Sequence, residues 1–186
     1  MNYQLPGEGS PLWETWVMLL NGYGYNWYRV DNQTRADDLL IRQKVSYFLG
    51  LAGSKLLETE AAYQRKYLPP GTRENPFPPP DKIAAHRRLR EFRQAVLAVE
   101  GVVRALPVPP TDKIWQRHRQ EITTLKRLQN ADVGLIGAAK LIADEVEKVS
   151  VDQWNDNETP ERLDGILGEF KNLIEERRAL LLIDGV

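Results

Sequence analysis

One pattern constrains the fold of this 186-residue chain most strongly. In a segment that ends at a group of prolines, apolar residues are spaced alternately four and three positions apart. This spacing produces the lengthwise stripe of a helix that packs nearly parallel or antiparallel to a neighbouring helix. Prolines at 107, 109 and 110 end the segment, because proline lacks a backbone donor and clashes with the preceding helical turn. The pattern therefore favours an all-α fold. The stripe consists of Ala85, Leu89, Phe92, Val96, Val99, Val103 and Leu106.

Similar patterns predict the other helices. A central helix is expected over 34–68, opening at a capping box of Thr34 and Asp37, and buried because 45–52 are apolar on nearly all sides. A Pro-rich loop follows at 69–80, and a long helical hairpin at 81–149 begins with Asp81 as its cap. The last helix is expected over 159–183. These segments predict a single all-α domain, a helical bundle of about five main helices built around the long antiparallel helical hairpin.

The hairpin also predicts one buried ion pair. Asp132 lies on the apolar stripe of the second arm, between Leu128 and Leu135. A hairpin that turns near residue 109 would bring Asp132 opposite Arg87 and Arg88. Because an unpaired buried carboxylate costs several kcal/mol, Asp132 is expected to pair with one of these arginines.

Composition excludes several classes of site. The chain has no cysteine and two histidines, so disulfides, thiol nucleophiles and histidine-rich metal centres are not expected. The sequence contains no P-loop, no dinucleotide-binding glycine motif and no H-E-x-x-H motif, so no cofactor is expected. Its first residues do not resemble a signal peptide, and no apolar run approaches the length that spans a bilayer. A cytoplasmic protein without a membrane partner is therefore predicted.

A neutral total charge hides two oppositely charged blocks. Residues 81–130 contain 11 basic and 5 acidic residues, whereas residues 131–186 contain 6 basic and 13 acidic residues. Dense positive charge binds phosphates through neutralisation and counterion release, so the basic arm is a candidate nucleic-acid surface. The alternative is that the two blocks pack on each other or occupy separate solvated faces. The candidate nucleic-acid residues are Arg87, Arg88, Arg90, Arg93, Arg117, Arg119, Lys126 and Arg127.

The amino-terminal region 1–33 is rich in aromatic residues, with 7 of the chain's 16 aromatic residues among the first 28. Within it, Ser10 and Pro11 form a helix start, and the predicted short helix ends at Leu20. Tyrosine and tryptophan anchor protein interfaces, although they also seal the ends of bundles and line small-molecule pockets. The predicted interface residues are Trp13, Trp16, Tyr23, Tyr25, Trp27 and Tyr28.

Two pairs of carboxylates suggest a third candidate site. Asp144 and Glu147 share one helix face, as do Glu161 and Asp164, and two such pairs brought together could hold Mg²⁺. The pairs resemble the E-E-x-x-E and E-x-x-D helices of the all-α nucleotide pyrophosphohydrolases of the MazG type. Glu161 and Asp164 fit the second motif, whereas Lys148 stands where the first requires its last glutamate. The resemblance implies magnesium-dependent hydrolysis of nucleoside triphosphates.

The sequence as a whole favours a non-catalytic helical interaction or assembly subunit that acts by protein–protein binding. Its partner would be another protein or a second copy of the chain. A nucleic-acid-binding subunit that uses 81–130 is the main alternative, and the two functions could coexist in one assembly. The pyrophosphohydrolase is the third hypothesis.

Overall fold

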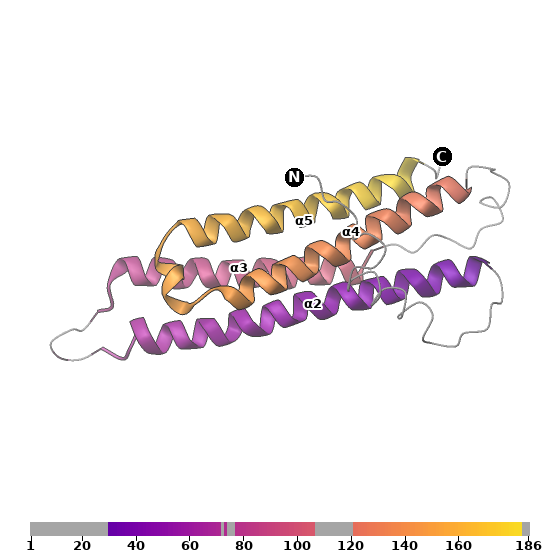
Figure 1. Cartoon of the computed structure of the whole chain (residues 1–186). Helices are drawn as coiled ribbons and strands as arrows, with labels where there is room; N and C mark the ends of the chain where they lie inside the picture. Colours follow the sequence, from indigo (N-terminus) through magenta and orange to yellow (C-terminus); the bar gives the residue numbers. More distant parts are fainter. Residues whose placement is uncertain (1–29, 72, 74–76, 107–120, 184–186) are drawn as a thin grey trace.

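The computed structural model of the chain describes residues 30–71, 73, 77–106 and 121–183, and these contain four long α-helices (Figure 1). Side chains are described from residue 39 in the first helix, and for residues 127 and 130–180 of the later segments. A short 3₁₀ helix, η2, spans Val151–Asn155. The α-helices are α2 (Val30–Tyr67), α3 (Pro80–Arg104), α4 (Glu121–Lys148) and α5 (Glu158–Ile183).

The four helices form an elongated bundle in which α2 and α4 run in one direction and α3 and α5 in the other (Figure 1). Helix α2 packs closely on α3 and α4, and α4 packs closely on α5. Helix α3 also contacts α5, so that α2 and α5 occupy opposite corners of the bundle. The element η2 lies between α4 and α5 and contacts α2, α3 and α5 at one end of the bundle.

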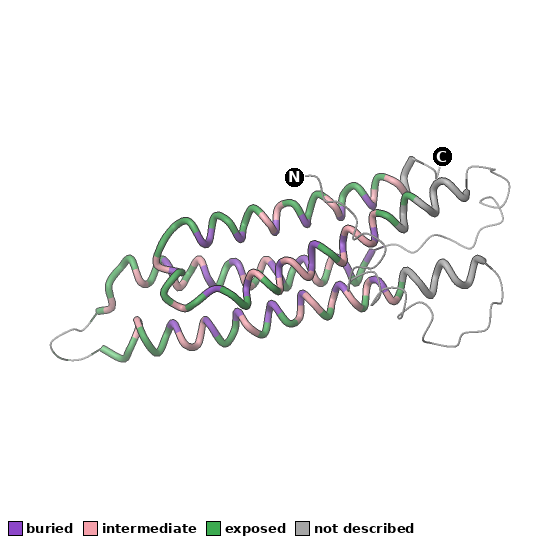
Figure 2. Tube along the Cα trace, in the orientation of Figure 1, coloured by how far each residue is buried: buried purple, intermediate pink, exposed green. Residues whose placement is uncertain are grey.

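The apolar core runs along the inside of all four helices, as the buried inner sides in Figure 2 show. The seven residues of the predicted stripe from 85 to 106 are all buried. The apolar residues on the inner side of α4 are buried as well, and so are those of α5. They are Leu135, Ala139, Ile142 and Val146 of α4 and Leu163, Leu167 and Phe170 of α5. The prediction of an all-α bundle is therefore confirmed, because the 3.6-residue period fixes which side of each helix faces the core.

Three predicted helix starts are displaced, and the start of α5 moves by one residue, to Glu158 rather than 159. Helix α2 begins at Val30, one turn before the capping box at Thr34, because no proline or glycine interrupts the chain between these positions. Helix α3 begins at Pro80, so Asp81 lies in its first turn and is not its cap. Pro80 needs no backbone donor at this position, and the carboxylate of Asp81 interacts favourably with the positive end of the helix dipole.

The long antiparallel hairpin expected over 81–149 is not confirmed. Among the described residues, α3 and α4 run in opposite directions, but each packs mainly on α2 and α5 rather than on the other. An apolar stripe determines which face of a helix is buried, and any of several neighbours can cover that face. Residues 107–120 contain the predicted turn and the first residues of the second arm of the hairpin. They lie outside the described part of the chain.

The buried ion pair of Asp132 exists, but its predicted partner is wrong. Asp132 is 5% exposed, and Arg177 of α5 donates a hydrogen bond from Nε to its Oδ1 at 2.6 Å. Arg88 instead donates to Asn157. The change of partner follows from the packing, because α4 lies against α5 and not against α3.

Candidate interaction surface

The outward side of α2 carries large apolar side chains. Leu39 and Leu57 are 50% and 54% exposed, and Tyr47 and Leu51 are 55% and 46% exposed. Leu39 and Leu57 are separated by 18 residues, which is five helical turns, so they lie on one line along α2. The expectation that 45–52 would be buried on all sides is wrong, because every helix of a four-helix bundle keeps one side toward solvent.

Helix α3 extends this apolar surface across the seam between the two helices. Leu97 is 40% exposed, and its Cδ2 atom lies 3.0 Å from the position that a Cβ on Gly53 of α2 would occupy. The missing side chain of Gly53 therefore lets Leu97 rest directly on the backbone of α2. We define the outer α2 face as Leu39, Tyr47, Leu51 and Leu57 of α2 together with Leu97 of α3.

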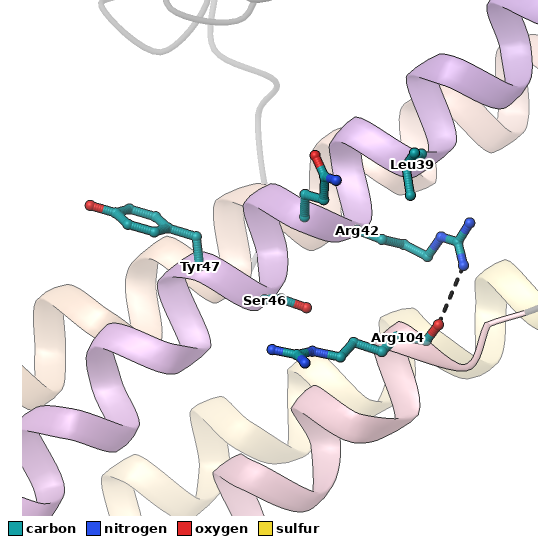
Figure 3. A pocket seen from close by; sticks show the side chains of 6 residues that line it. Leu39, Arg42, Ser46, Tyr47 and Arg104 are labelled. Carbon is teal, nitrogen blue, oxygen red and sulfur yellow. Dashed lines mark hydrogen bonds between the residues drawn. The ribbon is translucent and has the colours of Figure 1, made fainter.

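A hollow of about 450 Å³ lies between α2 and the last turn of α3 (Figure 3). Arg42 crosses the seam here and donates from Nη1 to the backbone oxygen of Leu106 at 3.2 Å, which satisfies a carbonyl at the end of α3. Figure 3 shows Ser46 and Arg104 pointing into the gap between the helices, whereas Tyr47 points away from it. The lining residues are Leu39, Arg42, Gln43, Ser46, Tyr47 and Arg104.

Charged side chains of both signs lie near the outer α2 face. Lys44 lies 5.1 Å from the ring centre of Tyr47, within the range of a cation–π contact. Arg87 and Arg90 of α3 are exposed, and within the described residues neither has an ionic partner. Glu58, which follows Leu57, is exposed as well, so a molecule on this face would meet apolar side chains beside both a cation and a carboxylate.

The predicted nucleic-acid residues do not all have the same surroundings. Arg93 donates to Glu60 of α2 at 2.8 Å and Arg88 to Asn157 at 2.5 Å, so both link elements of the bundle. Arg127 of α4 is exposed. Lys126 belongs to α4, but its side chain is not among those described, and Arg117 and Arg119 lie outside the described residues.

The predicted interface aromatics lie in the part of the chain before α2 that the structure does not describe. They are Trp13, Trp16, Tyr23, Tyr25, Trp27 and Tyr28.

The four candidate magnesium ligands are not gathered into one site. Asp144 pairs with Lys140 at 2.9 Å, and Glu147 pairs with Lys55 of α2 at 2.9 Å. Glu161 and Asp164 are exposed on α5. Among the described residues, no group of three or more histidine or acidic side chains could hold a metal ion. The geometry adds no support to the proposed magnesium chemistry.

A polar cluster that the sequence did not reveal joins η2 to α2 and α3. Asp152 accepts hydrogen bonds from Lys66 Nζ and from the hydroxyl of Tyr67, each at 2.5 Å. Asn155 accepts hydrogen bonds from Tyr63 and Lys82 through the same amide oxygen. These donors come from positions distant in sequence, and only the packing of η2 against α2 and α3 brings them together. We assign the cluster a structural role because each polar group is matched to a partner within the fold.

This cluster predicts acid-sensitive stability. Lys66 and then Tyr67 hold the pKa of Asp152 below its ordinary value, so the stabilisation is present above about pH 4 and is lost as the pH falls further. Asp152→Asn should therefore be less stable than the wild type at neutral pH, and the difference should shrink in acid. Urea unfolding at several pH values measures this difference. High salt should also reduce it, since the pair is exposed; a difference that is constant with pH would contradict the prediction.

Comparisons of the chain with protein-family models, with curated proteins and with solved structures find no match. No helix among the described residues has both the length and the apolar character needed to cross a membrane. The described residues place the chain in a broad class, the all-α helical bundles. Most of the large apolar side chains exposed on its described surface belong to the outer α2 face.

Proposed function

We propose that the chain is a non-catalytic helical interaction subunit that binds another protein through the outer α2 face. The single observation that supports the proposal is the presence of four half-exposed apolar side chains on the outward side of α2, together with the exposed Leu97 of α3. Several exposed apolar side chains on one side of a molecule are typical of interaction sites, and a groove between two helices suits an amphipathic helix.

The chemistry of the partner follows from the border of the face. Lys44 lies beside Tyr47, and the exposed Glu58 follows Leu57, so an amphipathic helix with charged residues of both signs beside its apolar stripe fits the surface. The leucines and Tyr47 would supply most of the affinity, because buried apolar and aromatic anchors dominate interface energetics.

Matched bait proteins test this proposal. The full chain, its Leu57→Asp variant and its Asn172→Asp variant are immobilised, and proteins retained from an extract are compared. Asn172 is exposed on α5, at the opposite corner of the bundle, so its variant controls for added charge. A protein partner is retained by the wild type and by Asn172→Asp and lost on Leu57→Asp, and its purified form should bind Leu57→Asp at least about tenfold more weakly. Equal binding by all three baits would overturn the proposal.

Nucleic-acid binding remains the second candidate, supported by the exposure of Arg87 and Arg90 on α3. Under this alternative, nucleic acid would co-elute with the protein in gel filtration at low salt and raise the absorbance at 260 nm relative to 280 nm. Added salt would release it, because phosphate contacts weaken steeply with ionic strength. Replacing both arginines by glutamate should then abolish co-elution. A wild-type peak free of nucleic acid at low salt would remove this alternative.

A further inference from the structure

We propose that the segment Phe77–Pro79, which leads into α3, is a second docking element of the chain. Its partner is a protein with an aromatic-lined groove that binds polyproline II segments. The inference goes beyond the proposed function, because the segment joins α3 at the end of the bundle where α2 ends (Figure 1). Tyr67, the last residue of α2, lies ten residues beyond Leu57, which is about 15 Å along the helix. The segment therefore uses no residue of the outer α2 face.

Phe77 is the most exposed large apolar side chain that the structure describes. It is 86% exposed, whereas the next most exposed, Tyr47, is 55% exposed. A ring that sealed this end of the bundle would be buried, as Trp154 of η2 is. Phe77 instead presents its ring to solvent, where an apolar pocket of another protein can receive it.

Covalent geometry fixes the backbone of the segment. Phe77, Pro78 and Pro79 are each followed by a proline, which keeps the preceding residue out of the helical region. Pro79 accordingly has φ −58° and ψ 134°, close to the values of polyproline II. Three residues form one turn of this left-handed helix, about 9 Å long. Because the conformation that such grooves bind is already present, docking loses little conformational entropy.

Helix α3 anchors the segment and leaves part of its backbone available. Pro80 is the first residue of the helix, and the carbonyl of Pro79 accepts backbone hydrogen bonds from the first helical turn at 3.1 and 3.2 Å. The carbonyls of Phe77 and Pro78 accept no backbone hydrogen bond among the described residues. Tyrosine and tryptophan side chains that line a groove can donate to these carbonyls while their rings pack on the prolines. The segment thus offers a phenyl ring, proline rings and two acceptors.

Charge does not define the partner. The side chain of Asp81 is 69% exposed and lies 3.4 Å from the ammonium of Lys82. That ammonium also donates to Asn155 of η2 at 2.9 Å. In the sequence, Arg73 and Glu74 precede the segment. Both signs of charge therefore flank it, and recognition rests on the phenyl ring and the prolines.

Titration of isolated recognition domains with the full chain tests the inference. The probes are panels of purified SH3, WW and EVH1 domains, the classes whose aromatic-lined grooves bind polyproline II segments. Each domain is labelled with ¹⁵N, and its amide chemical shifts report where the chain binds. The chain is used as wild type, as Phe77→Ala, and as Pro78→Ala with Pro79→Ala. The matched control, Pro69→Ala with Pro70→Ala, changes two exposed prolines of the same loop that follow no phenylalanine.

We expect at least one domain to bind the wild type through its groove with a Kd below about 1 mM. Binding should weaken at least about tenfold for Phe77→Ala and for the Pro78 and Pro79 double variant, and it should be unchanged in the control. Absence of binding to every domain would overturn the inference. Equal binding by all variants, or an equal loss in the control, would overturn it as well. Far-UV circular dichroism establishes that every variant is folded.

One further variant separates this inference from the proposed function. Leu57→Asp alters the outer α2 face and should bind the selected domain as tightly as the wild type does. Loss of domain binding in Leu57→Asp would show that the domain sits on the outer α2 face and would overturn the inference. Conversely, Phe77→Ala should retain the protein that the outer α2 face captures, so either proposal can fail without the other.

Discussion

Replacing Asp132 by alanine is expected to lower the free energy of unfolding by about 3–5 kcal/mol, the range found when one partner of a buried ion pair is removed. Asp132 is 5% exposed and Arg177 is 2% exposed, and the two side chains join α4 to α5 at 2.6 Å. The variant removes the buried carboxylate that accepts the hydrogen bond from Nε of Arg177, and so breaks this buried ion pair. Urea unfolding at neutral pH, followed by far-UV circular dichroism, measures the loss.

A double replacement separates two contributions to the free energy of unfolding: the cost of removing one partner of the pair, and the net contribution of the intact pair. Asp132→Leu combined with Arg177→Met removes both charges and keeps apolar volume, so it should recover much of the stability that the single variant loses. A single variant within about 1 kcal/mol of the wild type would contradict the prediction, since breaking a buried ion pair costs more than that.

The second large effect is expected at the opposite end of the bundle. Trp154 of η2 is 1% exposed, and its ring centre lies 6.0 Å from that of Phe92 of α3. Trp154→Ala would remove the largest buried side chain and open a cavity where η2 meets the helices, so we expect a loss of about 3–5 kcal/mol. Chemical denaturation of the full chain measures this loss.

A conservative variant provides the control for Trp154. Trp154→Phe keeps an aromatic ring in the site and sacrifices no described hydrogen bond, because the indole N–H has no acceptor among the described residues. Its loss should therefore be clearly smaller than that of Trp154→Ala. Equal losses for the two variants would contradict the prediction, because they would show that a phenyl ring restores none of the packing that alanine loses.

The polar cluster around η2 illustrates why part of the structure escaped sequence reasoning. Residues 152–158 read as an acidic loop, and nothing near them in sequence identifies Lys66 or Tyr67 as partners of Asp152. Contacts across more than eighty residues depend on how the helices are arranged, which local patterns do not encode. The outer α2 face, by contrast, had a signal in the sequence. The run from Val45 to Ala52 is apolar on nearly all sides, and this pattern predicts burial, whereas Tyr47 and Leu51 remain about half exposed.

Asp132 shows most clearly which features follow from the local sequence and which depend on tertiary packing. Its place on an apolar stripe predicted burial and the need for a cation, because helical periodicity and the cost of burying charge are local properties. The choice of Arg177 over Arg87 or Arg88 required the tertiary structure, since it depends on which helix packs against α4.

The sequence by itself thus determined the helical class, the buried side of each described helix and most helix ends, because proline, caps and the 3.6-residue period act over a few turns. Only the tertiary structure decided which helices are neighbours, which ion pairs form between them and which apolar side chains remain exposed. An apolar stripe accepts any complementary neighbour, and the final arrangement depends on the packing of all four helices together.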